Sequence, residues 1–256
     1  MNPDAIKPLS GRVALVTGSG RNIGAAIAQA LAQAGAAVAV NGHRDIKALE
    51  SRVKLLQQQG VNSCCVVGDV GNSTDIDRMV GEVERTLGPV DIVVSNAAVR
   101  PMSALLDITD ADWDAVIRTN LNAPFYLARR TLPAMMTGKW GRFIHISGLD
   151  GFTGHMPLRA HNVACKAGVM ALAKAIAREF GSYGITANTV APGAIDTERD
   201  WSQYVHYDPK EVVKDIPVAR LGTVDDIAAA CVYLCTDAAG FISGQTLHLN
   251  GGQYMF

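Results

Sequence analysis

The chain has 256 residues, which suits one large α/β domain or two small ones. Apolar residues make up 48% of the sequence and charged residues 18%, which excludes a disordered or fibrous protein. A formal net charge of -1, with no run of Lys or Arg, gives no electrostatic sign of a nucleic-acid or anionic membrane partner. No stretch approaches the roughly 18 consecutive apolar residues of a spanning helix, and the first residues contain no apolar signal-type segment. We therefore predict a globular, cytoplasmic protein.

Short runs rich in Val and Ile alternate with longer stretches of helical periodicity along the whole sequence. This alternation is typical of βαβ units around a parallel sheet. No linker or low-complexity run divides the chain, so one domain over residues 1–256 is expected. The fold class predicted is α/β, a single-domain doubly wound Rossmann fold with a central parallel sheet of about seven strands flanked by helices. The seven runs expected to form strands are residues 13–17, 37–41, 64–68, 91–96, 142–147, 186–191 and 245–250.

Several short signals mark where helices begin and end. Gly35 is suited to close the first helix, Thr109 with Asp112 to open another as a capping box, and Thr223 with Asp226 to open the last. Residues 195–218 break the pattern with many polar and aromatic side chains before a proline. An insertion of this kind between a strand and a helix predicts a lid over a ligand.

The cysteines are odd in number and lie mostly within apolar segments. None has a histidine at metal-ligand spacing, so we predict buried free thiols and no metal site. The five are Cys64, Cys65, Cys165, Cys231 and Cys235.

The first strand runs into "TGSGRNIG", which then enters a helix. Glycines in this context let backbone N–H groups and a helix N-terminus approach a pyrophosphate, and Gly18, Gly20 and Gly24 supply them here. The sequence therefore predicts a dinucleotide site at this turn.

The end of the second strand indicates which dinucleotide is bound. An acidic residue there would accept a hydrogen bond from the 2′-hydroxyl of NAD and would repel the 2′-phosphate of NADP, but this chain has Gly42. His43 and Arg44 follow, and Arg21 adds a second guanidinium in the glycine-rich turn. Guanidinium groups suit phosphate, so NADP is favoured over NAD. The alternative is that Arg44 is a solvated surface charge and Asp45 binds the ribose.

Together with this turn, several later segments resemble the short-chain dehydrogenase/reductase family over nearly the whole chain, in particular 3-oxoacyl-carrier-protein-reductase-like members. The turn matches T-G-x-x-x-G-x-G with Asn22 at the middle glycine, and Asn tolerates left-handed backbone angles better than most residues. Further matching segments are "GDV", "SNAA" for N-N-A-G, "TNLNAP", "APGAID" and the stretch from "RLGTVDD" to "LNGG". The cofactor residues that the resemblance implies are Gly18, Ser19, Gly20, Arg21, Asn22, Ile23, Gly24, His43, Arg44, Asp69, Val70, Asn96, Ala97, Lys166, Pro192, Gly193, Ile195 and Thr197.

The resemblance also implies a catalytic set of serine, tyrosine, lysine and asparagine. Lys166 and Asn120 match the last two. Four residues before Lys166, where tyrosine is expected, the chain has Asn162, whose carboxamide has no proton to give up near neutral pH. At the serine position, Ser147 is one residue early and Gly148 aligns better from the strand, so either residue can occupy it.

The group that replaces the tyrosine is left open by the sequence. The loop before the helix is one residue longer than in close relatives, so alignment from the strand side puts His161 at the tyrosine site. Histidine titrates near neutrality and suits acid–base work, although His161 lies about 140° around a helix from Lys166 unless that helix begins after it. His155, in the loop expected to face the substrate, is a second candidate. Other candidate substrate residues are Arg100, Met156, Arg159, Trp201 and Tyr204.

Three functions remain open at this point. The first is an NADP-dependent oxidoreductase acting on a carbonyl or alcohol, with His161, His155 or water replacing the tyrosine. The second is an enzyme that keeps the nucleotide pocket but performs lyase, dehalogenase or group-transfer chemistry, and the third is an inactive binding protein. The expected partner is a small-molecule substrate. The Ala-rich helices predicted at 110–136 and 162–180, with the apolar end "GGQYMF", also resemble surfaces that this family buries between subunits, which predicts a homotetramer or at least a homodimer.

Overall fold

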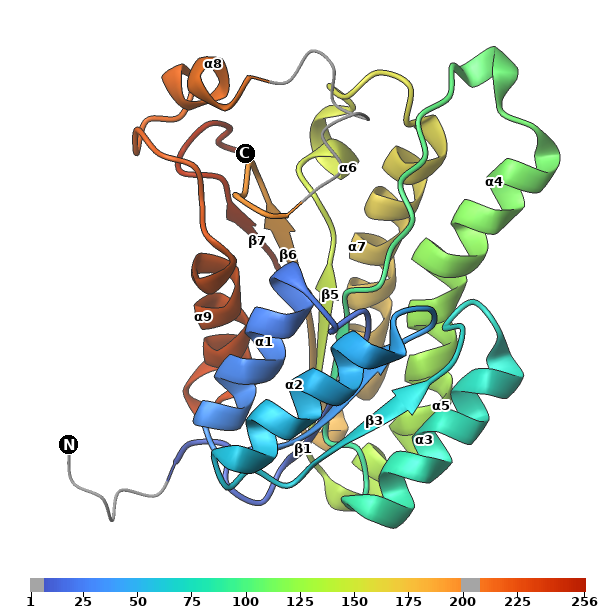
Figure 1. Cartoon of the computed structure of the whole chain (residues 1–256), viewed down its shortest axis with the longest axis vertical. Coiled ribbons are helices and arrows are strands. Elements are labelled where there is room, and N and C mark those ends of the chain that lie inside the picture. Colours follow the sequence, from blue (N-terminus) through green and yellow to red (C-terminus); the bar gives the residue numbers. More distant parts are fainter. Residues whose placement is uncertain (1–6, 199–207) are drawn as a thin grey trace.

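Seven parallel strands form one sheet in the spatial order β3-β2-β1-β4-β5-β6-β7 (Figure 1). The computed structural model describes residues 7–198 and 208–256. The chain moves from β1 outward to β3, then returns to the other side of β1 and continues from β4 to β7. The strands are β1 (Val13–Val16), β2 (Ala37–Gly42), β3 (Ser63–Val67), β4 (Ile92–Ser95), β5 (Gly141–Ile146), β6 (Ile185–Pro192) and β7 (Thr246–Leu249).

Helices cover both faces of the sheet, as Figure 1 shows. One π-helical turn, Arg118–Asn122, lies between α4 and α5. The α-helices are α1 (Asn22–Gln33), α2 (Ile46–Gln58), α3 (Ser73–Thr86), α4 (Asp110–Ile117), α5 (Ala123–Gly138), α6 (Asp150–Thr153), α7 (Ala160–Phe180), α8 (Pro209–Lys214) and α9 (Val224–Cys235).

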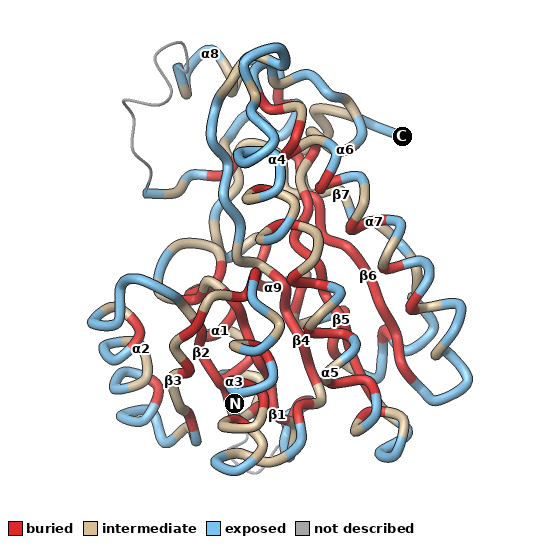
Figure 2. Tube along the Cα trace, turned by 90° about the vertical axis from the view of Figure 1, so that its right-hand side faces the viewer, coloured by how far each residue is buried: buried red, intermediate tan, exposed pale blue. Residues whose placement is uncertain are grey.

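The sheet separates two apolar cores. Side chains from α1, α2 and α9 pack against one face of the strands, and side chains from α3, α5 and α7 pack against the other. The strands are buried in the middle of the molecule while the outer surfaces of the helices are exposed (Figure 2). The near-continuous Val and Ile runs of the sequence follow from this two-sided burial.

The predicted fold class is confirmed, and each strand boundary lies within one residue of its predicted position. Thr223 and Asp226 form the complete capping box of α9, while Thr109 accepts the N–H of Asp112 at the start of α4. The helix predicted at 110–136 is interrupted, because the π-helical turn divides it into α4 and α5. The helix predicted at 162–180 begins two residues earlier, at Ala160.

One further expectation, that all five cysteines are buried, needs correction. The five cysteines are free, but only Cys165, Cys231 and Cys235 are buried, because Cys64 and Cys65 lie on β3 at the edge of the sheet, where cover is incomplete. In the described part of segment 195–218, residues Pro209–Lys214 form α8. Among the described residues, no helix is both long and apolar enough to cross a bilayer.

Candidate active site

Most of the predicted site residues that the structure describes follow the carboxyl ends of the parallel strands. β1 and β4 are neighbours there, although β2 and β3 separate them in sequence. Their connections leave in opposite directions, and such a switch point opens a crevice in doubly wound sheets. The glycine-rich turn follows β1 at this position.

The glycine-rich turn can approach a ligand only because two of its residues lack side chains. Gly18 has a φ of 60°, and a Cβ there would lie 2.9 Å from the Cα of Ala97. At Gly24 a Cβ would collide with the Gly18 carbonyl oxygen and with Nδ2 of Asn96. The close packing of this turn therefore requires glycine at both positions.

Helix α1 begins at this turn without a side-chain cap. Its N-cap residue, Arg21, is extended and makes no capping hydrogen bond, and the first turn contains no acidic residue. By contrast, Asp45 caps α2 and Asn72 caps α3. The free N–H groups and positive dipole end of α1 suit a phosphate, so this turn fits the pyrophosphate of a dinucleotide.

Thr17 holds the end of β4 against this turn. Its Oγ1 accepts the backbone N–H groups of Asn96, at 3.0 Å, and Ala97, at 3.1 Å. Nδ2 of Asn96 in turn donates to the carbonyl oxygens of Thr17 and Gly18. The sequence interpretation did not assign Thr17, although it is the first letter of the quoted turn motif.

His43 and Arg44 follow β2, and the next residue along the chain, Asp45, caps α2. His43, Arg44 and Arg21 are exposed. Oδ1 of Asp45 accepts the Ala48 N–H at 3.0 Å as the cap of α2. One oxygen of the carboxylate that was the alternative ribose ligand therefore has a structural role.

The end of β3 is held by short carboxylate hydrogen bonds. Oδ1 of Asp69 accepts the Gly71 N–H at 2.8 Å, and the Asp69 N–H donates to Asp75. That backbone hydrogen bond lowers the pKa of Asp75. Val70 is buried beside these groups. Asp75 and Asn41, whose Nδ2 donates to the Val66 and Gly68 carbonyl oxygens, are positioning residues that sequence patterns did not identify.

Two buried asparagines meet on the other side of the crevice. Asn120 lies in the π-helical turn, and its Nδ2 donates to Oδ1 of Asn162 at 3.2 Å and to the Val99 carbonyl oxygen at 2.7 Å. Oδ1 of Asn120 accepts the Val99 N–H. The wider helical turn thus joins α4, α7 and the segment after β4 at one carboxamide.

Lys166 lies one turn after Asn162 on α7 and is almost wholly buried. Its Nζ donates to the Ile146 carbonyl oxygen at 2.7 Å, at the end of β5. Burial, with a smaller contribution from the positive charge of Arg100, lowers the pKa of Lys166 to about 8. An amine with this pKa exchanges protons near neutral pH, which an ordinary lysine does not.

Ser147 and Gly148 differ in what surrounds them. Oγ of Ser147 donates to the backbone carbonyl oxygen of Lys166 at 2.8 Å, so this hydroxyl ties β5 to α7. A Cβ at Gly148 would meet no atom within 4 Å. The open side of this strand end is therefore at Gly148.

His161 lies inside α7, because the helix begins before it. It is fully buried, and its Nδ1 accepts the Asn162 N–H. Cys165, one turn later on the same side, contacts the Val116 carbonyl oxygen of α4. His161 therefore shares the α4 side of the helix with Cys165, and the sequence alternative in which the helix starts after His161 is wrong.

The loop between α6 and α7 carries three of the other predicted substrate residues, while Arg100 follows β4. Nδ1 of His155 lies 2.7 Å from Oγ1 of Thr153 and 3.4 Å from the Asp150 carboxylate. Met156 is half-buried, Arg159 is buried at the start of α7, and Arg100 is exposed. The predicted substrate residues Trp201 and Tyr204 lie outside the described part of the chain.

The segment after β6 is held by backbone hydrogen bonds. The Gly193 N–H donates to the Leu249 carbonyl oxygen, and Asp196 N–H donates to that of Gly222. Pro192 and Thr197 are half-buried, and Ile195 is buried. A hollow of about 170 Å³ lies beside this segment and is lined by Ala194, Ile195, Ile216, Val218, Arg220, Gly222, Asp226, Leu249, Asn250 and Gly251.

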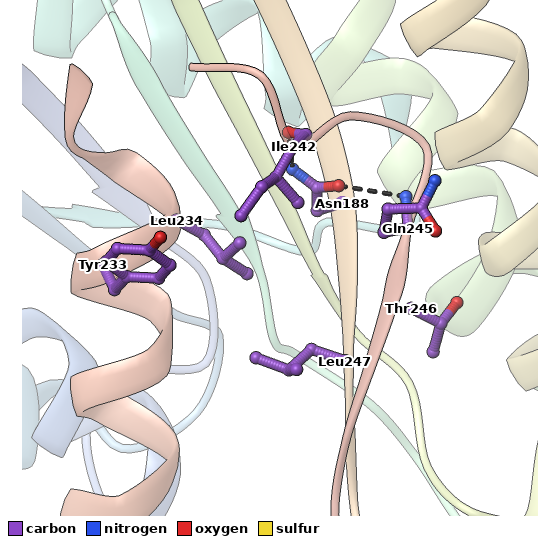
Figure 3. Close-up of a pocket in the computed structure, with 7 residues that line it drawn as sticks. All are labelled: Asn188, Tyr233, Leu234, Ile242, Gln245, Thr246 and Leu247. Atoms are coloured by element: carbon purple, nitrogen blue, oxygen red, sulfur yellow. Dashed lines mark hydrogen bonds between the residues drawn. The ribbon is translucent and has the colours of Figure 1, made fainter. Parts of the chain in front are cut away.

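A second hollow, of about 100 Å³, lies between α9 and β7 at the edge of the sheet (Figure 3). Its lining includes none of the predicted site residues, so we give it no part in the chemistry. In the described ranges, no group of three or more His, Cys, Asp or Glu side chains is placed to hold a metal ion.

Known proteins share both the sequence and this arrangement. Residues 18–253 match the family described as enoyl-(acyl carrier protein) reductase. The chain is 39% identical over 243 residues to the 3-oxoacyl-[acyl-carrier-protein] reductase FabG of Staphylococcus aureus, covering 94% of this chain and 98% of the relative. It is 37% identical over 245 residues to nodulation protein G of Azospirillum brasilense, with coverage of 95% and 98%.

A solved structure of a gluconate 5-dehydrogenase from Burkholderia cenocepacia, in complex with NADP and tartrate, has a TM-score of 0.88 to this chain. The two are 31% identical, and the match covers 97% of each. Together with the family match and the sheet order, these similarities show that the chain belongs to the short-chain dehydrogenase/reductase family.

Proposed function

We propose that this protein is an NADP-dependent oxidoreductase that interconverts a carbonyl compound and its alcohol through an atypical active site. The observation that carries the proposal is the placement of buried Lys166 at the same strand edge as the uncapped N-terminus of α1. A dinucleotide held by its pyrophosphate at α1 has its reactive ring within the crevice beside β4 and β5. The predicted cofactor residues are proposed to contact the dinucleotide along its length.

NADP is the favoured cofactor because of the charges at the end of β2. The strand ends in Gly42, where an acidic residue would favour NAD. His43 and Arg44, which follow it in the sequence, and Arg21 in the glycine-rich turn have exposed side chains. Asp45, the alternative ribose ligand, is used as a helix cap. The similar gluconate 5-dehydrogenase was solved with NADP, which supports the same choice here.

The proposed atypical feature is that Asn162 stands where the family resemblance implies a tyrosine. Its Oδ1 is engaged by Asn120, which leaves Nδ2 to donate a hydrogen bond to a substrate oxygen. A carboxamide can orient that oxygen but cannot protonate it. Ser147 is also engaged, with the Lys166 carbonyl, so we assign it to holding α7 rather than to the substrate.

We assign the proton to Nζ of Lys166. NADPH, when bound, supplies the hydride. Asn162 orients the substrate oxygen, Lys166 releases the proton that this oxygen gains, and solvent returns a proton to the amine. His155 is the alternative donor, since it lies on the loop after α6, next to Asp150. His161 is buried on the side of α7 that faces α4, which argues against His161 as the proton donor.

The substrate is proposed to enter over the loop between α6 and α7. Arg100, His155 and Met156 are its expected contacts, and residues 195–218 are its proposed lid. The open space at Gly148 leaves room for a substrate group where the resemblance implies a serine hydroxyl.

A second candidate function is non-redox chemistry in the same pocket. The Asn120–Asn162 pair favours it, because both side chains are neutral and neither can act as an acid. In that case the enzyme would convert its substrate without consuming NADPH.

The test follows NADPH absorbance at 340 nm across a panel of ketones that includes an acetoacetyl thioester and a keto-sugar acid. We expect oxidation of NADPH, with at least about tenfold tighter binding of NADPH than of NADH, a difference of about 1.4 kcal/mol. Arg44→Ala should remove most of that preference, because the guanidinium grips the 2′-phosphate. Equal affinities would overturn the choice of cofactor, and product formation without NADPH loss would favour the non-redox function.

A further inference from the structure

Asn22 links two parts of the site that are 176 residues apart. Its Nδ2 donates to the Glu198 carbonyl oxygen at 2.9 Å, and its Oδ1 accepts the Glu198 N–H at 3.0 Å. Both ends of the carboxamide are therefore used on the main chain of one residue. A paired contact of this kind fixes position and orientation together.

The segment that Asn22 contacts is the one that follows β6. Its start is held by a hydrogen bond from the Gly193 N–H to the Leu249 carbonyl oxygen. Its middle is held by one from the Asp196 N–H to the Gly222 carbonyl oxygen. Asn22 adds a third anchor at Glu198, directly after Thr197. Thr197, a proposed cofactor residue, thus lies between two fixed neighbours.

The backbone of Asn22 explains why this residue type is used. Its φ is 51°, in the left-handed region that favours glycine, and the motif that the turn resembles has glycine there. Glycine would form the turn but could not reach Glu198. Asn enters this region more readily than most side chains and also carries a donor and an acceptor.

We propose that Asn22 is a positioning residue that fastens segment 192–198 to the glycine-rich turn. Resting on the proposed function, this contact holds the residues around the nicotinamide in register with those around the pyrophosphate. The two halves of a bound NADPH would then be gripped by one connected unit rather than by two separate loops.

Asn22→Gly is the variant that tests this role, because it keeps the backbone conformation and removes only the paired contact. Lys139→Gly is a matched control: Lys139 also has a left-handed φ, 50°, and is exposed at the far end of α5. Calorimetric titration would compare NADPH with 2′,5′-ADP, which has the 2′-phosphate and the adenosine 5′-phosphate but neither the second phosphate of the pyrophosphate nor the nicotinamide.

We expect Asn22→Gly to weaken NADPH binding about tenfold, because binding must then order the released segment 192–198, and to leave the affinity for 2′,5′-ADP within about twofold. Lys139→Gly should change neither affinity. In the cofactor-free protein, hydrogen exchange at the Glu198 amide should become at least about fivefold faster in Asn22→Gly.

The positioning role would be overturned if hydrogen exchange at the Glu198 amide were unchanged in Asn22→Gly, or if this variant lost equal affinity for NADPH and for 2′,5′-ADP. Equal losses would mean that Asn22 serves only the glycine-rich turn. If the unmodified protein binds neither ligand, the proposed function is overturned, and so is the role of this contact in cofactor binding. The hydrogen-exchange result would then show only that Asn22 holds Glu198 in place.

Discussion

Lys166 determines how the proposed chemistry should respond to pH. Its pKa is lowered to about 8, chiefly by burial, and the protonated amine is the proposed donor for carbonyl reduction. The reduction rate should therefore be highest below this pH and should fall as the pH rises through it. Lys166→Arg keeps the positive charge but cannot release a proton, so it should lower the rate by about 10² to 10⁴ and abolish the pH dependence. Steady-state rates across this range, with NADPH affinity as the folding control, measure both effects.

Two neighbouring variants complete this experiment. His161→Ala should retain turnover, because the imidazole is buried on the α4 side of α7. Asn162→Tyr should raise the rate towards activated ketones, since it places a phenol one turn before Lys166. Loss of turnover in His161→Ala, with normal NADPH affinity, would move the proton donor from Lys166 to His161.

The arrangement of the site residues could be predicted from the sequence where it depends only on their spacing along one helix or strand. Lys166 and Asn162 share a face of α7 because they are four residues apart, and the sequence shows this directly. The bonds from Asn120 to Asn162 and from Ser147 to the Lys166 carbonyl were not predictable. They depend on how α4, β5 and α7 are packed, which no local pattern records.

Strand β5 illustrates the same limit for a whole element. Its sequence predicts a strand, but alternation alone does not say that Arg142 and His145 are buried. They are buried because helices cover both faces of the sheet, so no residue of β5 reaches solvent. His145 lies between Ser95 and Thr189 on the neighbouring strands, and its ring nitrogens have no hydrogen-bond partner among the described residues.

This burial makes the sheet sensitive to acid. Desolvation lowers the pKa of His145 to about 4, from an ordinary 6.5. Between these values the unfolded chain binds the proton and the folded chain does not, so stability falls as the pH drops below about 6.5. The free energy of unfolding should decrease by about 2 kcal/mol from this group between pH 7 and pH 5. Urea unfolding of His145→Phe at both pH values should show a smaller loss of unfolding free energy between pH 7 and pH 5. If the loss were as large as in the unmodified protein, other groups would be its cause.

At the scale of the molecule, the order of strands and helices was predictable because each βαβ unit has its own periodicity. Sheet order followed from the rule for doubly wound folds rather than from any single segment. Which surfaces would meet other subunits is harder to predict, since an exposed apolar residue and a buried one look alike in sequence. The structure identifies candidates on the predicted surfaces: Trp113 and Phe125 on α4 and α5, and Met255 and Phe256 at the C-terminal end, are all exposed.

Exposing large apolar side chains to water is unfavourable in free energy, and association between subunits can bury them. We therefore predict a homotetramer, or at least a homodimer, in which the outer faces of α4, α5 and α7 and the C-terminal end are covered. Phe125, whose side chain is 44% exposed, is a suitable probe, because its replacement leaves the two cores intact. Phe125→Glu should place a charge in the interface and reduce the mass measured by light scattering at micromolar concentration, with an unchanged circular dichroism spectrum. Lys139→Glu, at the end of the same helix, is the control for added negative charge and should leave the mass unchanged. A monomeric unmodified protein would contradict the predicted assembly, whereas an oligomer unaffected by Phe125→Glu would move the interface to other surfaces.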